Sequence, residues 1–318
     1  LVLIFSGTRV VFVPFGDVVA FAALSLAAFE TGRTPATIGL VATLASLAVV
    51  VEVVSLVRAG ELARIPRALV GWGLLPALPC LAAWAISGTA APAVVRIVVA
   101  IALVVPITPL VARVALQPMA DASVLVLLNA SLALHFLLSG LGLLFFGPEG
   151  SRTGPLAEGA LTLPGGFPLS AQVMLMIAAA LVLSAMFYLL FERTVAGKAL
   201  RATAVNRVGA RLVGIRPART ALLAYTLAGL LAGLIGVLVA PVTTMYYDSG
   251  FLIGLKAFVA AITGDLVSYP LTAVGALAVG AVESFASFWS GAFKDVIVFS
   301  LLIPVLMLRS FMARHDEE

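Results

Sequence analysis

Charged residues, cysteine and histidine are all scarce in this sequence. Of its 318 residues, 11% are charged and 62% are hydrophobic, whereas a soluble domain has about 25% charged and about 45–50% apolar residues. A water-soluble fold of this size could not bury that much apolar surface, which argues against a soluble enzyme, a nucleic-acid-binding protein and a disordered chain. The single cysteine, Cys80, rules out an internal disulfide framework and a cysteine-based metal cluster. Two histidines leave little for a metal site, so we expect no metal or other cofactor.

Long apolar runs, by contrast, fill most of the chain. A bilayer core of about 30 Å needs about 20 apolar residues per helix, and the alternating pattern of a membrane barrel is missing. We therefore predict an all-α, polytopic transmembrane helical bundle of eight to ten spans, forming a single domain over residues 1–318 in the cell (inner) membrane. Because Leu1 opens inside an apolar run, we expect the N-terminus to be truncated within the first membrane helix. The predicted spans are roughly 11–30, 36–57, 68–88, 92–112, 122–146, 170–191, 220–244, 251–267, 268–287 and 292–309.

The distribution of basic residues predicts the orientation of these spans. Residues 193–219 contain seven of the nineteen basic residues and no acidic residue, so the positive-inside rule places this loop in the cytoplasm. The loop at 147–168 then lies outside, and the loop at 58–67 and the C-terminal tail lie inside.

Within the basic loop, residues 199–213 show helical periodicity. Leu200, Ala204, Val208 and Leu212 recur every fourth residue opposite the arginines, which predicts a short amphipathic helix outside the membrane. Gly214 is expected to end this helix, and Pro217 prevents its continuation. A solvated orienting loop and a helix lying on the membrane surface are the competing interpretations. A helix joined stiffly to two spans could instead transmit force from a soluble partner.

The stretch from Gly197 to Ile215 (GKALRATAVNRVGARLVGI) resembles the cytoplasmic signature of ABC permeases for branched-chain amino acids. In that family the pattern G-x-A-x-R-A-x-A, followed by Asp or Asn and later by A-x-L-x-G-I, forms the coupling helix that docks on the ATPase. The segments AYTLAGLLAGLIGVLVA, GLKAF and GAVES further along the chain also fit the family. The resemblance covers roughly residues 120–310. It implies ATPase-coupling roles for Gly197, Ala199, Arg201, Ala202, Ala204, Asn206, Arg207, Ala210, Leu212, Gly214 and Ile215.

The resemblance implies the permease subunit of an ATP-driven importer for branched-chain or other small amino acids or amides. Expected partners are ABC ATPase subunits, a second permease subunit (identical or related) and an extracytoplasmic substrate-binding protein. The chain itself has no P-loop, because its only Gly-Lys pair, Gly197–Lys198, is followed by Ala199, so the partner would hydrolyse ATP. A sugar-type ABC permease and, from another class, a secondary transporter remain alternatives. A membrane-embedded enzyme is the weakest rival, since no catalytic constellation is visible.

Several ionisable residues fall inside or next to predicted spans, where charge is costly and marks candidate functional sites. The pathway candidates are Asp17, Lys256, Asp265 and Glu283. Asp17 is expected first to cap a helix that begins near Val18, with a pathway role as the alternative. Around it, FVPFGDVVAFAA keeps only Gly16 and Asp17 of the family's N-F-A-H-G segment and lacks its histidine, and Asp265 stands where the family has a glycine.

Other residues in the spans carry structural expectations. For His135 a buried, hydrogen-bonded role is favoured over a proton relay. The glycine pairs Gly229/Gly233 and Gly250/Gly254 predict close contacts between helices. Four prolines are expected to kink two of the spans; they are Pro76, Pro79, Pro106 and Pro109.

Overall fold

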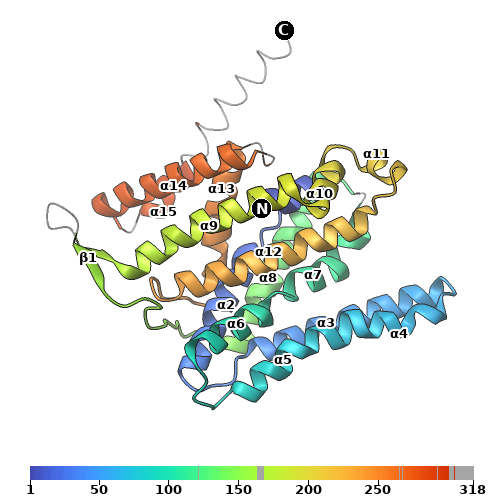
Figure 1. The fold of residues 1–318 in the computed structure, drawn as a ribbon, viewed down its shortest axis with the longest axis horizontal. Helices are drawn as coiled ribbons and strands as arrows, with labels where there is room; N and C mark the ends of the chain where they lie inside the picture. The colour runs from blue at the N-terminus through green and yellow to red at the C-terminus, as the bar shows by residue number, and fades with distance from the viewer. Residues whose placement is uncertain are drawn as a thin grey trace, which may run out of the picture.

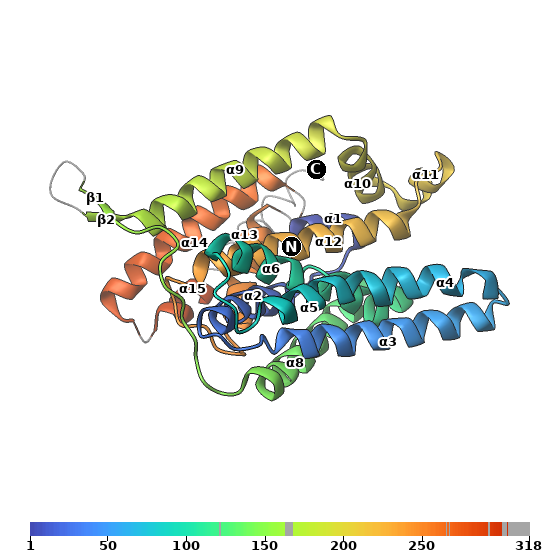
Figure 2. The ribbon, with the colours of Figure 1, turned by 60° about the horizontal axis from the view of Figure 1, so that its bottom comes forward.

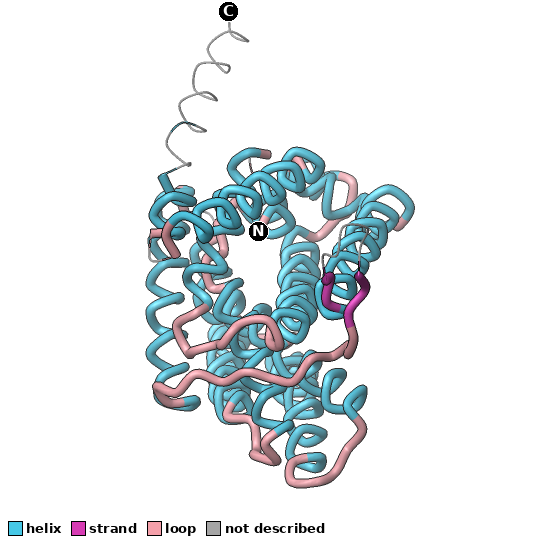
Figure 3. The backbone as a smooth tube through the Cα atoms, turned by 90° about the vertical axis from the view of Figure 1, so that its left-hand side faces the viewer, coloured by secondary structure: helices cyan, strands magenta, loops and turns pink. Residues whose placement is uncertain are grey.

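The computed structural model describes residues 1–120, 122–162, 168–264, 266, 268–291, 293–300 and 304. Helices dominate these residues, and one antiparallel pair of three-residue strands accompanies them (Figure 3). In the first half of the chain the elements are α1 (Val2–Thr8), α2 (Phe15–Glu30), α3 (Thr37–Arg58), η1 (Leu62–Arg64), α4 (Ile65–Ala68), η2 (Leu69–Leu74), α5 (Leu75–Ile86), α6 (Ala93–Val104), α7 (Ile107–Val111), η3 (Ala112–Leu116), η4 (Gln117–Met119) and α8 (Val124–Phe146). In the second half they are β1 (Ala160–Thr162), β2 (Pro168–Ser170), α9 (Ala171–Arg193), α10 (Val195–Val205), α11 (Arg207–Leu212), α12 (Pro217–Val239), α13 (Gly250–Thr263), α14 (Tyr269–Trp289) and α15 (Lys294–Ser300).

Seven helical segments of the described chain are long and apolar enough to cross a membrane. Two further apolar helices, α2 and α13, have 16 and 14 residues and are shorter than a full span. The predicted polytopic helical bundle is therefore confirmed, and the span predicted over 251–267 is the short helix α13. The last predicted span begins with α15, and most of its remainder lies outside the described residues. The seven long segments are Thr37–Arg58, Leu62–Ile86, Ala93–Met119, Val124–Phe146, Ala171–Arg193, Pro217–Val239 and Tyr269–Trp289.

The prolines act on their helices in two ways. The π-helix η2 ends two residues before Pro76, where the wider turn makes room for a ring that would strike the carbonyl four residues earlier. Pro79 lies inside α5 without ending it. At Pro106, by contrast, α6 has ended and α7 begins at the next residue. The predicted interruptions are thus a widened turn in one span and a break in the other.

Helix α2 lies at the centre of the bundle. Fourteen of its sixteen residues are buried, as expected for a helix that is apolar on all sides. Phe21 stacks on Phe146 of α8 at 5.3 Å between ring centroids. On α12, Gly236 faces Ala22 and Ala23, while Gly229 faces Thr108. The small residues of α12 therefore serve close helix packing, as their spacing predicts.

Helices α2 and α13 cross where both carry glycine. A Cβ atom added to Gly250 would lie 2.5 Å from the Cα and the backbone nitrogen of Asp17. A Cβ atom on Gly16 would overlap the carbonyl oxygen of Gly250, and one on Gly254 would lie 2.9 Å from the carbonyl oxygen of Val13. The two backbones thus touch without intervening side chains. This contact fixes the start of α13 beside the first turn of α2.

The molecule is elongated, and different connecting segments lie at its two ends (Figures 1 and 2). The α3–α4 turn and the pair α10–α11 lie at one end, and the strands β1 and β2 lie at the other (Figure 1). At the strand end, the backbone nitrogen of Gly154 donates to Glu30 at 3.0 Å, and Ser151 pairs with Met245. Gln172 at the start of α9 donates to the carbonyl of Leu238 at 2.8 Å. This arrangement agrees with placing loops 58–67 and 193–219 on one side of the membrane and loop 147–168 on the other.

The predicted orientation can be tested by cysteine labelling in a chain whose Cys80 is replaced by serine. Val205 lies in the loop that is predicted to be cytoplasmic and is 82% exposed, so it is suitable for labelling on that side. We expect Glu149→Cys to react with a membrane-impermeant maleimide in intact cells, and Val205→Cys to react only after permeabilisation. The reverse pattern would show that the topology is inverted.

The backbone contact between α2 and α13 at Gly16, Gly250 and Gly254 (the glycine crossing) predicts that a larger side chain at these positions lowers stability. Gly250→Ala should lower the melting temperature in detergent, because the new methyl group forces α2 and α13 apart at a cost of about 1–3 kcal/mol. Gly140→Ala on α8 is the matched control, since nothing lies within 4 Å of a Cβ atom there. Equal melting temperatures for the two variants would contradict the assigned role of Gly250.

Candidate functional site

The basic segment forms two helices rather than the single amphipathic helix predicted over residues 199–213. Asn206 adopts an extended backbone conformation between α10 and α11, with φ −150° and ψ 106°. Its side-chain oxygen accepts hydrogen bonds from the backbone nitrogens of Val208 (3.0 Å) and Gly209 (2.9 Å). Asparagine at this position therefore caps a new helix instead of continuing the old one. Periodicity alone missed this break, although the strong preference of Asn for N-caps could have suggested it.

A close turn connects α9 to α10. Thr194 caps α10 by accepting from the nitrogen of Gly197 at 3.0 Å. A Cβ atom on Gly197 would lie 2.6 Å from the Cα of Phe191 and would overlap the carbonyl of Leu190. Only glycine fits this approach, so the first residue of the predicted coupling pattern sets the angle between α9 and α10.

The end of α11 shows the predicted glycine stop. Gly214 has φ +84°, a left-handed conformation that favours glycine. The nitrogen of Ile215 donates to the carbonyl of Ala210 at 2.9 Å, and that of Gly214 to the carbonyl of Arg211 at 3.1 Å. This pair of bonds is a Schellman motif. Pro217 then occupies the first position of α12, where its missing N–H costs nothing.

The two helices bury one face and expose another. Leu200, Thr203 and Ala210 are buried, and the hydroxyl of Thr203 hydrogen-bonds to that of Thr220 on α12 at 3.2 Å. Helix α10 also contacts α1 and α9. The predicted continuous stripe is wrong, because the break at Asn206 turns the last two apolar positions outward: Val208 is 66% exposed and Leu212 is 84% exposed.

One ion pair fixes the basic segment to the preceding span. Arg201 donates to the Glu192 carboxylate at 2.8 Å, and this hydrogen bond raises the pKa of Arg201. Ala199, Ala202 and Ala204 are the small residues of α10; the Ala199 carbonyl accepts from Thr203 and the Ala202 carbonyl from the nitrogen of Asn206. Arg207 is the first residue of α11. Among the described residues no ion pair involves Lys198, Arg211, Arg216 or Arg219.

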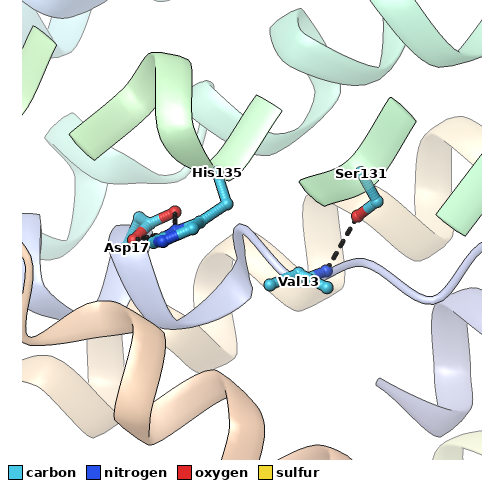
Figure 4. A network of polar contacts seen from close by, with 4 residues as sticks. All are labelled: Val13, Asp17, Ser131 and His135. Atoms are coloured by element: carbon cyan, nitrogen blue, oxygen red, sulfur yellow. Dashed lines mark hydrogen bonds and ion pairs between the residues drawn. The ribbon is translucent and has the colours of Figure 1, made fainter. Parts of the chain in front are cut away.

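A second cluster lies in the interior of the bundle. Asp17 and His135 form a buried pair in which the ring Nδ1 lies 2.8 Å from Asp17 Oδ2 and 3.0 Å from Oδ1 (Figure 4). The His135 ring also stacks on Phe251 of α13 at 4.8 Å between centroids. One turn earlier on α8, Ser131 accepts from the backbone nitrogen of Val13 at 2.9 Å (Figure 4). The favoured interpretation of His135 as a buried, hydrogen-bonded residue is confirmed.

The predicted capping role of Asp17 is wrong. Helix α2 begins at Phe15, before Asp17, and its N-cap position is Pro14. The Asp17 carboxylate therefore lies in the first turn and points across to α8. No local sequence pattern indicates this partner, because 118 residues separate Asp17 from His135.

The third cluster joins the last three helices of the described chain. Lys256 Nζ lies 2.5 Å from Glu283 Oε1 and 2.9 Å from Asp295 Oδ1. The pathway candidates Lys256 and Glu283 are thus brought together, and Asp295, which sequence reasoning did not single out, joins them. The fourth candidate, Asp265, lies outside the described residues. Asp17 belongs to the separate cluster on the other side of α13.

Comparison with known proteins matches most of the chain to one family. The model of the family described as "Branched-chain amino acid transport system / permease component" matches residues 16–308. The LivH permease proteins of the high-affinity branched-chain amino acid transport systems of Salmonella typhimurium and Escherichia coli K12 are each 37% identical over 116 residues, which is 35% of this chain and 37% of theirs. The corresponding BraD protein of Pseudomonas aeruginosa is 33% identical over 144 residues, 43% of this chain and 45% of its own. The aligned parts thus span less than half the length of these relatives, and no solved structure matches.

The buried pair predicts a large cost of removing one partner. His135→Ala should lower stability in detergent by about 3–5 kcal/mol, because Asp17 is left as an unpaired charge in the interior. The control is Phe136→Ala at the neighbouring, 68% exposed position, which should cost much less. Adding Asp17→Asn to His135→Ala should restore part of the loss. If His135→Ala and Phe136→Ala melt at the same temperature, the pair does not hold α8 to α2.

Proposed function

Because the chain belongs to the family of branched-chain amino acid transport permease components, we propose that it is the membrane subunit of an ATP-driven ABC importer. In this role two permease subunits, identical or related, enclose a translocation pathway. Separate ATPase chains bind at the cytoplasmic end, and a substrate-binding protein delivers its cargo at the opposite end. The names of the relatives support a branched-chain or similar small amino acid as the substrate.

The observation that carries this proposal is the surface of α10 and α11. Val205, Val208 and Leu212 are strongly exposed apolar residues at the basic end of the molecule. Exposed apolar side chains surrounded by cations are typical of a docking surface for a soluble partner. The proposed ATPase contact consists of the family-like residues of α10, α11 and the following turn, from Gly197 to Ile215.

The connections of these helices suit them to transmit movement. On one side the Gly197 turn and the Glu192–Arg201 pair join α10 to α9. On the other side the Thr203–Thr220 hydrogen bond joins α10 to α12. A displacement of the docking surface by the ATPase would therefore move the cytoplasmic ends of two spans together. A surface-lying anchor would not need connections to two spans.

For the pathway, we propose the region around α13. This short helix begins beside the fully buried Asp17 and carries Lys256 in its middle, opposite Glu283 of α14. Short helices that begin within the membrane often border substrate sites in transporters. In this arrangement Lys256 and Glu283 face the pathway, and Asp17 supports its wall through His135. Asp265, just beyond α13, completes the set of candidates proposed from the sequence.

The docking surface can be tested by co-purification of the chain with its ATPase in mild detergent. Leu212→Glu should weaken the association at least about tenfold, because a central apolar contact is replaced by a charge. Leu62→Glu is the matched control: this leucine is also exposed (60%) at the same end of the molecule but lies outside the docking surface.

One double variant tests the ion pair and the turn that support the docking surface. Arg201→Glu opposes Glu192, and Gly214→Leu strains the left-handed turn, so the double variant should also lose the ATPase. Association that survives both changes, or that Leu62→Glu disrupts equally, would overturn the coupling role of α10 and α11.

A further inference from the structure

The cluster of Lys256, Glu283 and Asp295 combines membrane depth with partial exposure. Glu283 lies six residues before the end of the long span α14, about 9 Å along the helix axis. Lys256 occupies the middle of the apolar helix α13. The three side chains are nevertheless 22%, 30% and 29% exposed. Charged groups at this depth rarely face lipid, and they generally contact a water-filled cavity or other polar groups.

The ion pairs leave part of each charged group without a partner. Lys256 donates a hydrogen bond to Glu283 Oε1 and lies at ion-pair distance from Asp295 Oδ1, which has no hydrogen-bond partner among the described residues. Among the described residues, no hydrogen bond or ion pair involves Glu283 Oε2 or Asp295 Oδ2. The cluster can therefore accept further donors at two carboxylate oxygens and can donate once more from the ammonium group. A mixed set of this kind complements a molecule that carries both charges.

Apolar packing holds the three helices at this spacing. Val259, Val279 and Val298 are buried against one another, one helical turn from Lys256, Glu283 and Asp295 respectively. Because each helix contributes one charge and one valine, the charged groups cannot separate without opening this apolar layer. The site is thus built into the helix contacts and does not depend on a surface loop.

We propose that this cluster is a binding site for the charged ends of a zwitterionic α-amino acid. The ammonium group of the ligand binds between Glu283 Oε2 and Asp295 Oδ2, and its carboxylate accepts from Lys256. The proposal rests on the transport function proposed above, and it assigns the recognition of charge to three named residues.

Water access is the first test and is independent of transport. In a chain with Cys80→Ser, Asp295→Cys keeps the Lys256–Glu283 pair and should react in membrane vesicles with a cationic methanethiosulfonate reagent. Val274→Cys is the matched control, because Val274 is 63% exposed on the apolar side of α14 and should not react. Failure of Asp295→Cys to react, or equal reaction at both positions, would overturn the site.

Ligand protection tests the chemistry. L-Leucine should slow the labelling of Ser287→Cys, which lies one turn after Glu283 and leaves all three charged residues in place. The analogues 4-methyl-2-oxopentanoate, which lacks the ammonium group, and isoamylamine, which lacks the carboxylate, should protect less. Equal protection by all three compounds, or no protection by L-leucine, would contradict recognition of both charges.

Uptake into proteoliposomes that contain the complete transporter tests the role in transport. Glu283→Gln should reduce L-leucine uptake at least about tenfold. Association with the ATPase should be kept, because Glu283 lies outside the docking surface formed by Gly197 to Ile215. Normal uptake by Glu283→Gln would overturn the site but leave the transport function standing. If the unaltered chain shows no ATP-driven uptake, the proposed function fails, and the labelling experiments still decide whether the cluster binds a zwitterion.

Discussion

Contact between backbones at the glycine crossing of α2 and α13 is the constraint on which the rest of the bundle depends. Within a membrane, apolar side chains gain little from leaving lipid for protein, so helices associate through close packing and polar bonds. Gly16 and Gly250 supply the packing, and Asp17 and His135 supply a polar bond next to it. Helix α12 repeats the arrangement through Gly236 against Ala22. The buried central helix is thus held on three sides by contacts that larger residues would prevent.

Charge at membrane depth is handled by pairing between helices that are distant in the sequence. Asp17 pairs with His135, and Glu52 of α3 pairs with Arg113 in η3. The Asp17–His135 pair is buried, with side chains 0% and 5% exposed, whereas Arg113 and Glu52 are 21% and 19% exposed. The Lys256 cluster differs from both pairs, because one cation meets two carboxylates from two other helices. Under the proposal above, this composition separates a binding role from a purely structural one.

The sequence predicts the helices well because hydrophobic run length and basic-residue bias are local properties. It also predicts the glycine stop at Gly214, since a left-handed residue has few alternatives. It fails where the outcome depends on distant partners or on competition between local signals. The pairing of Asp17 with His135 needs the three-dimensional crossing, and the capping strength of Asn206 overrode a regular apolar period. The partial exposure of Glu283 likewise follows only from how α14 packs.

These features connect the two ends of the proposed mechanism. Helix α10 is joined to α9 and α12, and α12 packs along the central helix α2 through glycine. Helix α2 in turn touches α13 at Gly250, six residues before Lys256. A movement at the proposed docking surface would pass from α10 to α12 through the Thr203–Thr220 hydrogen bond, and from α12 to α2 and α13 through close contacts at glycine. Under this mechanism the glycines of α2, α12 and α13 serve transport as well as folding, because each shortens the path by which a displacement is passed on.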